Sequence, residues 1–249
     1  MKPVLSFLAR AVALLLLSLI ALQLFFVLRI AMMLVIDPQS TSFQRSEARR
    51  IIGEKNDLPW RQAWVPAARI SDHLKRAVIA SEDGSFAEHG GVDWDSLEKA
   101  WERNQKAEAA AERRQARAPA SAPAVEAKVV GGSTITQQLA KNLLLSGERT
   151  VLRKAQEFVL TLALEGLLSK ARILEIYLNS VEWGEGVFGA QAAAQHYFRT
   201  DADKLSAYQA ARLAVMLPAP KRFEKRPGSA YLAARSATVM ARMNSVALP

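Results

Sequence analysis

The feature that most constrains this chain is a long uncharged stretch near its N-terminus. Residues 11–28 read AVALLLLSLIALQLFFVL, and IAMMLVI follows Arg29. Between Arg10 and Asp37, Arg29 is the sole charged residue. A helix of this length crosses a hydrocarbon core of about 30 Å, because each residue adds about 1.5 Å. The sequence therefore predicts a transmembrane anchor over residues 11–36.

A cleaved signal peptide and a buried core helix are the alternatives to a retained anchor. A signal peptide has a shorter apolar core with a small-residue cleavage site soon after it, and neither is clear here. Lys2 and Arg10 precede the span. By the positive-inside rule, residues 1–10 should lie in the cytoplasm and residues 37–249 outside it.

Composition narrows the chemistry that the rest of the chain can perform. The sequence holds no cysteine and three histidines, which excludes disulfides, thiol nucleophiles and iron–sulfur clusters. Its 33 Lys and Arg against 24 Asp and Glu give a net charge of +9. Such an excess favours nucleic acid, an anionic membrane surface or an anionic substrate as the partner.

Beyond the anchor, the hydrophobic pattern has a helical period almost to the end of the chain. Residues 37–70 are expected to be an irregular juxtamembrane segment, because prolines and a glycine interrupt them. A main domain should occupy residues 71–225, followed by a C-terminal helical segment over 226–249. No alternating pattern typical of strands occurs, so the predicted fold class is all-α.

Two finer expectations concern the middle of the main domain. Asp93 or Asp95 should cap a helix that buries Trp94, Leu97 and Trp101 on one side. Residues 105–128 are rich in alanine and charge and lack large apolar side chains, which predicts a mobile, solvated insert.

Two clusters of polar residues lie where chemistry is expected. EDGSFAEHGG begins at Glu82 and places adjacent carboxylates near a histidine and two glycines, a pattern that suits a general base. GGSTITQQLAKN, over residues 131–142, begins a helix with hydroxyl and N–H groups that could hold an oxyanion or phosphate. A capped helix end is the structural alternative for both.

Two further clusters are weaker evidence for a functional site when each is taken alone. RKAQE, over residues 153–157, could be an ordinary surface ion pair between Arg153 and Glu157. KARILEIYLN, over residues 170–179, is followed by a glycine-rich stretch, and Glu175 and Asn179 suit a role in bracing neighbouring helices.

In this order and spacing, the four clusters resemble the motifs of the family 51 glycosyltransferases, the peptidoglycan glycosyltransferases. The resemblance covers roughly residues 70–225, with LAVMLPAP at 213–220 as a looser fifth motif. With one anchor and no penicillin-binding domain, the chain is similar to the monofunctional members. Two features depart from the family: Gln209 replaces a usual glutamate, and the segment before Gly131 is longer.

The resemblance implies a lysozyme-like helical domain that polymerises lipid II, with inversion, at the outer face of the bacterial inner membrane, in the periplasm. Glu82 would be the general base and Glu157 the second functional acid. Lys141, Arg153 and Lys154 would stabilise the departing lipid diphosphate. The remaining implied substrate-binding residues are Asp83, Phe86, His89, Ser133, Thr134, Gln137, Gln138 and Asn142.

Cofactors and partners follow from the same resemblance. No cofactor is certain, although a divalent cation, Mg or Mn, could assist at the diphosphate. The expected partners are lipid II, the growing glycan chain, the membrane and other cell-wall synthesis proteins, whereas nucleic acid is not expected. A lysozyme-like glycan-cleaving enzyme and a non-catalytic membrane-anchored scaffold are the alternatives.

Overall fold

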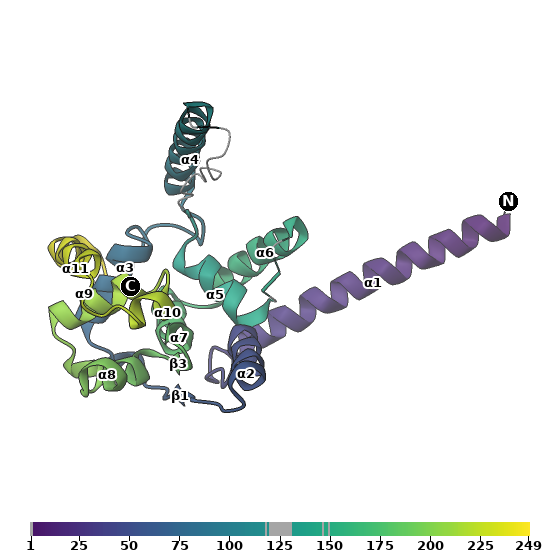
Figure 1. Ribbon diagram of the computed structural model, residues 1–249. Helices are drawn as coiled ribbons and strands as arrows, with labels where there is room; N and C mark the ends of the chain where they lie inside the picture. The colour runs from purple at the N-terminus through teal and green to yellow at the C-terminus, as the bar shows by residue number, and fades with distance from the viewer. Residues whose placement is uncertain (1, 118, 120–130, 146, 149) are drawn as a thin grey trace.

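The structure is a computed structural model that describes residues 2–117, 119, 131–145, 147–148 and 150–249. The described part is mainly helical, with three short strands (Figure 1). Its α-helices are α1 Lys2–Met32, α2 Ser42–Lys55, α3 Asp72–Glu82, α4 Trp94–Arg117, α5 Ile135–Leu144, α6 Val151–Leu167, α7 Lys170–Ser180, α8 Ala190–Phe198, α9 Ala207–Met216, α10 Pro220–Glu224 and α11 Ala230–Arg242.

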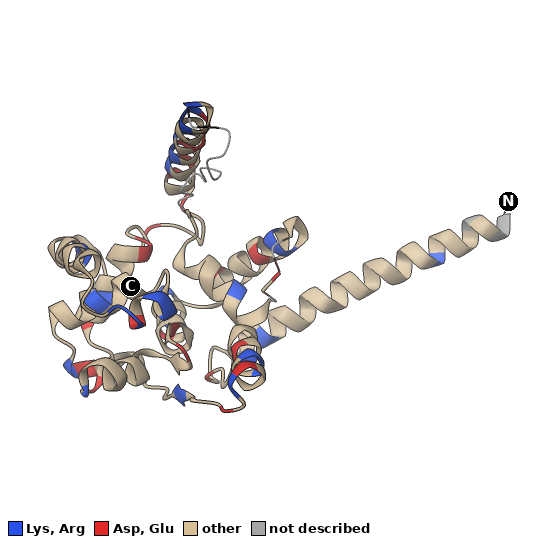
Figure 2. Ribbon diagram, viewed as in Figure 1, with Lys and Arg blue, Asp and Glu red and all other residues tan. Residues whose placement is uncertain are grey.

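Helix α1 projects far out of the helical domain (Figure 1). Its span Ser6–Met32 is long and apolar enough to cross a membrane, and its most hydrophobic window is only 6% buried. Figure 2 shows that charged residues are sparse along α1 and frequent on α2 and α4. The apolar N-terminal helix is therefore consistent with a single-pass membrane anchor, and the helix itself ends at Met32.

The C-terminal end of α1 is part of the domain's hydrophobic core. Phe26, Ile30 and Met33 are buried at helical spacing and join the core cluster. Arg172, on α7, donates to the Met33 carbonyl over 2.8 Å and to the Asp37 carboxylate over 2.7 Å. These contacts fix the position where the chain leaves the anchor.

Two groups of helices form the domain around one core. Helix α3 packs against α9 and α11, and α5 packs against α6 and α7. Leu74, Val78 and Ile79 give α3 a fully buried face, as their helical spacing predicts. The C-terminal end of α3 meets the N-terminal end of α5 where the two groups adjoin. The cavity described below lies beside this meeting point.

A small sheet was not expected from the sequence. Strands β1 Arg61–Gln62, β3 Val187–Phe188 and β2 Glu182–Gly184 lie in that order, with β1 parallel and β2 antiparallel to β3. Strands of two or three residues are too short to show an alternating pattern. Gly186 has φ 74°, and a side chain there would collide with the Pro59 carbonyl, which explains one glycine of the fourth motif.

The segment expected to be irregular contains a helix, α2. Thr41 and Gln44 form a capping box, in which each side chain bonds to the other's backbone N–H. Ile51, fully buried, anchors the helix to the core. The apolar residues of α2 are few, so its hydrophobic period is weak, but the T-x-x-Q pattern was a visible indication of its start.

Helix α4 corrects two expectations about the middle of the chain. Residues 105–117 continue this helix, because alanine and long charged residues have high helix propensity. Residues 118 and 120–130 of the expected insert lie outside the described residues. Asp93 does cap α4, through a 2.8 Å bond from the Ser96 N–H. Trp94 and Trp101, however, are 64% and 66% exposed, so the predicted burial of this face is wrong.

Candidate active site

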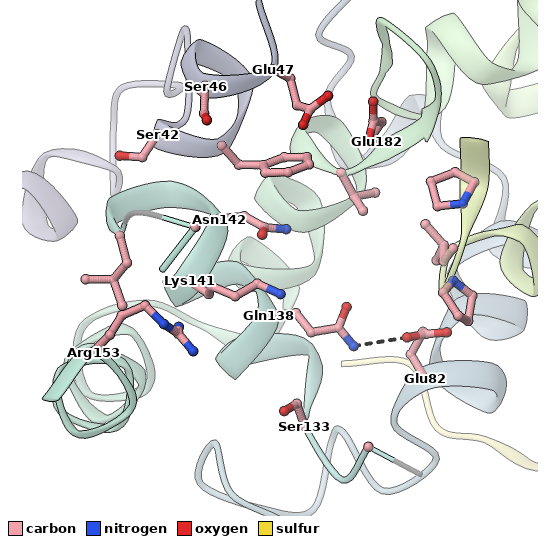
Figure 3. A pocket seen from close by; sticks show the side chains of 18 of the residues that line it. Ser42, Ser46, Glu47, Glu82, Ser133, Gln138, Lys141, Asn142, Arg153 and Glu182 are labelled. Carbon is pink, nitrogen blue, oxygen red and sulfur yellow. Dashed lines mark hydrogen bonds between the residues drawn. The ribbon is translucent and has the colours of Figure 1, made fainter. Parts of the chain in front are cut away.

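A cavity of about 800 Å³ opens between α2, α5 and the end of α3 (Figure 3). It brings together six of the residues predicted from the sequence. These are Glu82, Ser133, Gln138, Lys141, Asn142 and Arg153. Glu82 lies on one side of the cavity and Lys141 and Arg153 lie on the other, as Figure 3 shows, so Glu82 faces a positively charged wall.

Glu82 is the last residue of α3, and a chain of hydrogen bonds orients its carboxylate. The Gln138 amide donates to Glu82 Oε2 over 3.0 Å, and the Tyr177 hydroxyl donates to Gln138 Oε1 over 2.9 Å. Burial raises the pKa of Glu82, the Gln138 bond partly opposes the rise, and the Asp83 charge adds to it. A positioned carboxylate with a raised pKa is suited to accept a proton.

Asp83 connects the first motif to the second. Its carboxylate accepts from His89 Nε2 over 2.8 Å and from the Ile135 N–H, at the start of α5, over 2.9 Å. The Gly91 N–H donates to His89 Nδ1, so His89 carries its proton on Nε2. Burial raises the pKa of Asp83, and the His89 bond opposes that rise. Asp83 and His89 therefore fasten the loop that follows Glu82 to the start of α5.

Several predicted substrate-binding residues do not line the main cavity. Phe86 is fully buried, with the Lys170 ammonium 4.4 Å from its ring centre. Gln137 completes the capping box of α5 with Thr134, whose hydroxyl also donates to the Gly91 carbonyl over 2.7 Å. Phe86 therefore packs in the core and Gln137 caps α5, and neither lines the main cavity. Their role in substrate binding stays a prediction.

A second cavity, of about 320 Å³, lies on the other side of Glu82. Asp83, Thr134 and Ser133 line it, together with residues of α4. Glu82 and Ser133 therefore border both cavities.

The third motif is not an ordinary surface ion pair. Glu157 is 3% exposed, and its two carboxylate oxygens accept separately from Arg153, over 2.7 Å, and from Lys154. Arg153 lines the main cavity, whereas Glu157 and Lys154 are not among its lining residues. Glu157 thus holds two cations on one turn of α6, at the charged side of the cavity.

The fourth motif braces the fold, as its residues suggested. Asn179 accepts from the Val65 N–H over 3.0 Å and donates to the Val65 carbonyl over 2.9 Å. Glu175 accepts from the Ala67 N–H over 2.9 Å. Together they fasten residues 65–67 to α7.

The residues that form the wall of the cavity opposite α5 were not predicted from the sequence. Ser42, Phe43, Ser46 and Glu47 of α2 contribute to it, with Glu182 of β2. Lys221 lies behind the two acids, paired with Glu47 and 3.4 Å from Glu182 Oε1. These residues were missed because α2 was not recognised as a helix and because β2 is too short to show a pattern.

Glu182 should make stability depend on pH. Burial raises its pKa to about 7, with Lys221 opposing and Glu47 adding to the rise. Its protonated form is favoured in the folded state, so this stabilisation is complete below about pH 4.5 and is lost as the pH rises through 7. We expect Glu182→Gln to be more stable than the wild type at pH 8, by roughly 1–3 kcal/mol, and nearly equal to it at pH 4.5.

Thermal unfolding in detergent at the two pH values measures this difference. Glu185→Gln is the control, because Glu185 belongs to the same turn but is ion-paired with Arg50 and Lys55. A Glu182→Gln variant that is less stable than the wild type at pH 8 would show that the charged form is the favoured one.

The donor set for a divalent cation is poor in the part of the chain that the structure describes. No group of three or more His, Cys, Asp or Glu side chains converges among the described residues. Glu157 is the acid that contacts the cations, and its two carboxylate oxygens already accept hydrogen bonds from Arg153 and Lys154. These residues do not fit a protein-held Mg or Mn site.

Comparison with known proteins identifies the family. A family model described as transglycosylase matches residues 49–244. The biosynthetic peptidoglycan transglycosylase of Janthinobacterium sp. (strain Marseille) is 53% identical, over 92% of this chain and 91% of the relative. Those of Herminiimonas arsenicoxydans and Paraburkholderia xenovorans (strain LB400) are 50% and 48% identical, over 92% of this chain and 91% and 88% of the relatives.

The match covers both groups of helices, the four motifs and the lining of the cavity apart from the α2 residues before position 49. It confirms the expected fold class, an all-α, lysozyme-like domain behind one apolar N-terminal helix. The chain therefore belongs to the transglycosylase family and is a glycosyltransferase that acts on peptidoglycan.

Proposed function

We propose that the protein polymerises lipid II into β-1,4-linked glycan strands, with Glu82 as the general base. The observation that carries this proposal is the cavity in which Glu82, its pKa raised by burial, faces the cations Lys141 and Arg153. A base opposite a cationic wall suits a reaction that forms a glycosidic bond while it releases a diphosphate.

The reaction begins when Glu82 takes the proton of the acceptor sugar's 4-hydroxyl. The freed oxygen attacks the anomeric carbon of the growing chain, and the bond from that carbon to the diphosphate breaks. Attack from the face opposite the leaving group converts an α-linked donor into a β-linked product, so the reaction inverts. Gln138 holds the Glu82 carboxylate in place through the 3.0 Å hydrogen bond.

The leaving group is undecaprenyl diphosphate, whose negative charge grows as the bond breaks. Lys141 and Arg153 line the cavity where this charge develops. Glu157 keeps Arg153 and Lys154 in place without occupying the cavity. Charged donors that are positioned in advance stabilise a developing anion more than mobile ones, because they need not reorganise during the reaction.

The topology proposed from the sequence agrees with this chemistry. Lys2 and Arg10 should keep the N-terminus in the cytoplasm, which places the domain in the periplasm, at the outer face of the inner membrane. The outer end of α1 packs into the domain, so the cavity remains close to the bilayer that carries a lipid-linked substrate.

Incubating the purified full-length protein with labelled lipid II tests the proposal. We expect a ladder of glycan strands on a gel and release of undecaprenyl diphosphate. Finished sacculi in a parallel reaction should release no soluble muropeptides. Muropeptide release with no strands from lipid II would establish the glycan-cleaving alternative, and neither product would support the scaffold.

A further inference from the structure

The anchor and helix α6 are joined by an unusual polar contact. Gln23 lies inside the apolar span Ser6–Met32, and its amide exchanges two hydrogen bonds with the amide of Gln156, over 2.9 and 3.0 Å. Gln23 is half-buried and lies on the same face of α1 as the buried residues Phe26, Ile30 and Met33. Thus the outer part of the anchor, and not only its end, packs on the domain.

The position of Gln23 sets the depth of this contact. Nine residues separate Gln23 from Met32, the outer end of α1, so Gln23 lies about 14 Å further inward along the helix. The hydrocarbon core is about 30 Å thick, and the apolar span has 27 residues. With Met32 at the surface of the bilayer, Gln23 and its partner would lie at the depth of the acyl chains.

The exposed side of α6 has the composition that this depth requires. Val151 and Leu152 are 86% and 83% exposed, and Val159 and Leu162 are about half exposed. Water would disfavour these side chains, whereas acyl chains would accept them. An unpaired amide would be unfavourable in the same surroundings, so each glutamine needs the other.

We propose that Gln23 and Gln156 form an intramembrane amide pair that fixes the rotation and depth of α6 against the anchor. Gln156 adjoins Glu157, which holds Arg153 and Lys154 on the same two turns of α6. Gln23 is therefore a positioning residue. Through Gln156 it fixes the position of the active-site cations relative to the bilayer, and the exposed apolar side chains of α6 contact lipid acyl chains.

Because the sequence contains no cysteine, a thiol-specific cross-linker will react only with cysteines that are introduced. The full-length Gln23→Cys/Gln156→Cys variant is reconstituted in phosphatidylethanolamine–phosphatidylglycerol vesicles and treated with a short bifunctional methanethiosulfonate. A direct disulfide is not expected, because two glutamine side chains separate the backbones. Mass spectrometry should find the linked peptides. The matched control is Leu24→Cys/Gln156→Cys, because Leu24 is 56% exposed beside Gln23. Equal linking in both variants would overturn the proposal.

A spin label measures depth without depending on the pair. In the vesicles, a label at Val159→Cys should be more accessible to oxygen than to a water-soluble nickel complex. A label at Tyr208→Cys, on α9, should show the reverse, since Tyr208 is 47% exposed on the other group of helices. Similar nickel accessibility at both sites would place α6 in water and contradict the proposal.

The positioning role is tested by rate, and this arm alone rests on the proposed function. Without reagent, the Gln23→Cys/Gln156→Cys variant should lose roughly three- to tenfold in kcat/KM on lipid II, as expected for one intramembrane polar contact. Cross-linking should restore the rate, and a reductant should remove it again. If the wild type is inactive, the proposed function fails while the cross-linking result stands. Linking without any recovery of rate would reject the positioning role.

Discussion

Replacing Glu82 with glutamine should lower kcat on lipid II by about 10²–10⁴-fold and leave KM within a few-fold. Glutamine keeps the size of the side chain and its place against Gln138, but it accepts no proton at neutral pH. A sugar hydroxyl is too weakly acidic to attack without a base, so the chemical step should slow while binding persists. Initial rates of strand formation at several lipid II concentrations separate the two constants.

A matched control distinguishes this loss from a general effect of removing charge. Glu88 belongs to the same loop but is exposed and lines neither cavity. Glu88→Gln should therefore retain the wild-type rate. Thermal unfolding should show that Glu82→Gln is folded, and at least as stable as the wild type above neutral pH, because burial raises the Glu82 pKa and disfavours its charged form. A Glu82→Gln enzyme with wild-type kcat would rule out the general-base role.

The parts of the molecule that could be predicted from sequence were those with a strong local pattern. The uncharged run over residues 11–28 predicted α1, and the helical spacing of Leu74, Val78 and Ile79 predicted the buried face of α3. The motif residues of α3, α5 and α6 were found because unusual polar side chains cluster there, and the structure brings six of them to one cavity.

The parts that were missed depend on contacts between distant residues. Whether Trp94 and Trp101 are buried depends on which elements approach α4, and the sequence of α4 does not carry that information. Likewise, Glu182 reaches the cavity wall through a strand of three residues, and Glu47 through a helix with a weak apolar period. Membership of a motif also does not tell whether a residue lines the cavity, as Gln138 does, or lies outside its lining, as Phe86 and Gln137 do.

Replacing Glu157, the acid of the third motif, is the second change for which we expect a large loss of activity. Glu157→Gln should lower kcat on lipid II by roughly 10–10³-fold and reduce stability by about 1–3 kcal/mol. The carboxylate uses one oxygen for Arg153 and the other for Lys154, whereas the amide offers a single acceptor. One cation then loses its partner. Among the described residues, Arg153 Nε already lacks a hydrogen-bond partner, so this guanidinium depends on Glu157 for its position.

The stability loss is expected to be smaller than for a fully buried pair, because the Lys154 side chain is 51% exposed and water can replace part of its interaction. Glu165→Gln is the matched control. Glu165 lies on the same helix and pairs with Lys170 over 2.8 Å, but it lines neither cavity. Both variants should unfold at lower temperature than the wild type, and only Glu157→Gln should lose kcat. Equal losses of kcat in the two variants would show that Glu157 acts through stability alone, since the cation-holding role requires a defect specific to the turn that carries Arg153 and Lys154.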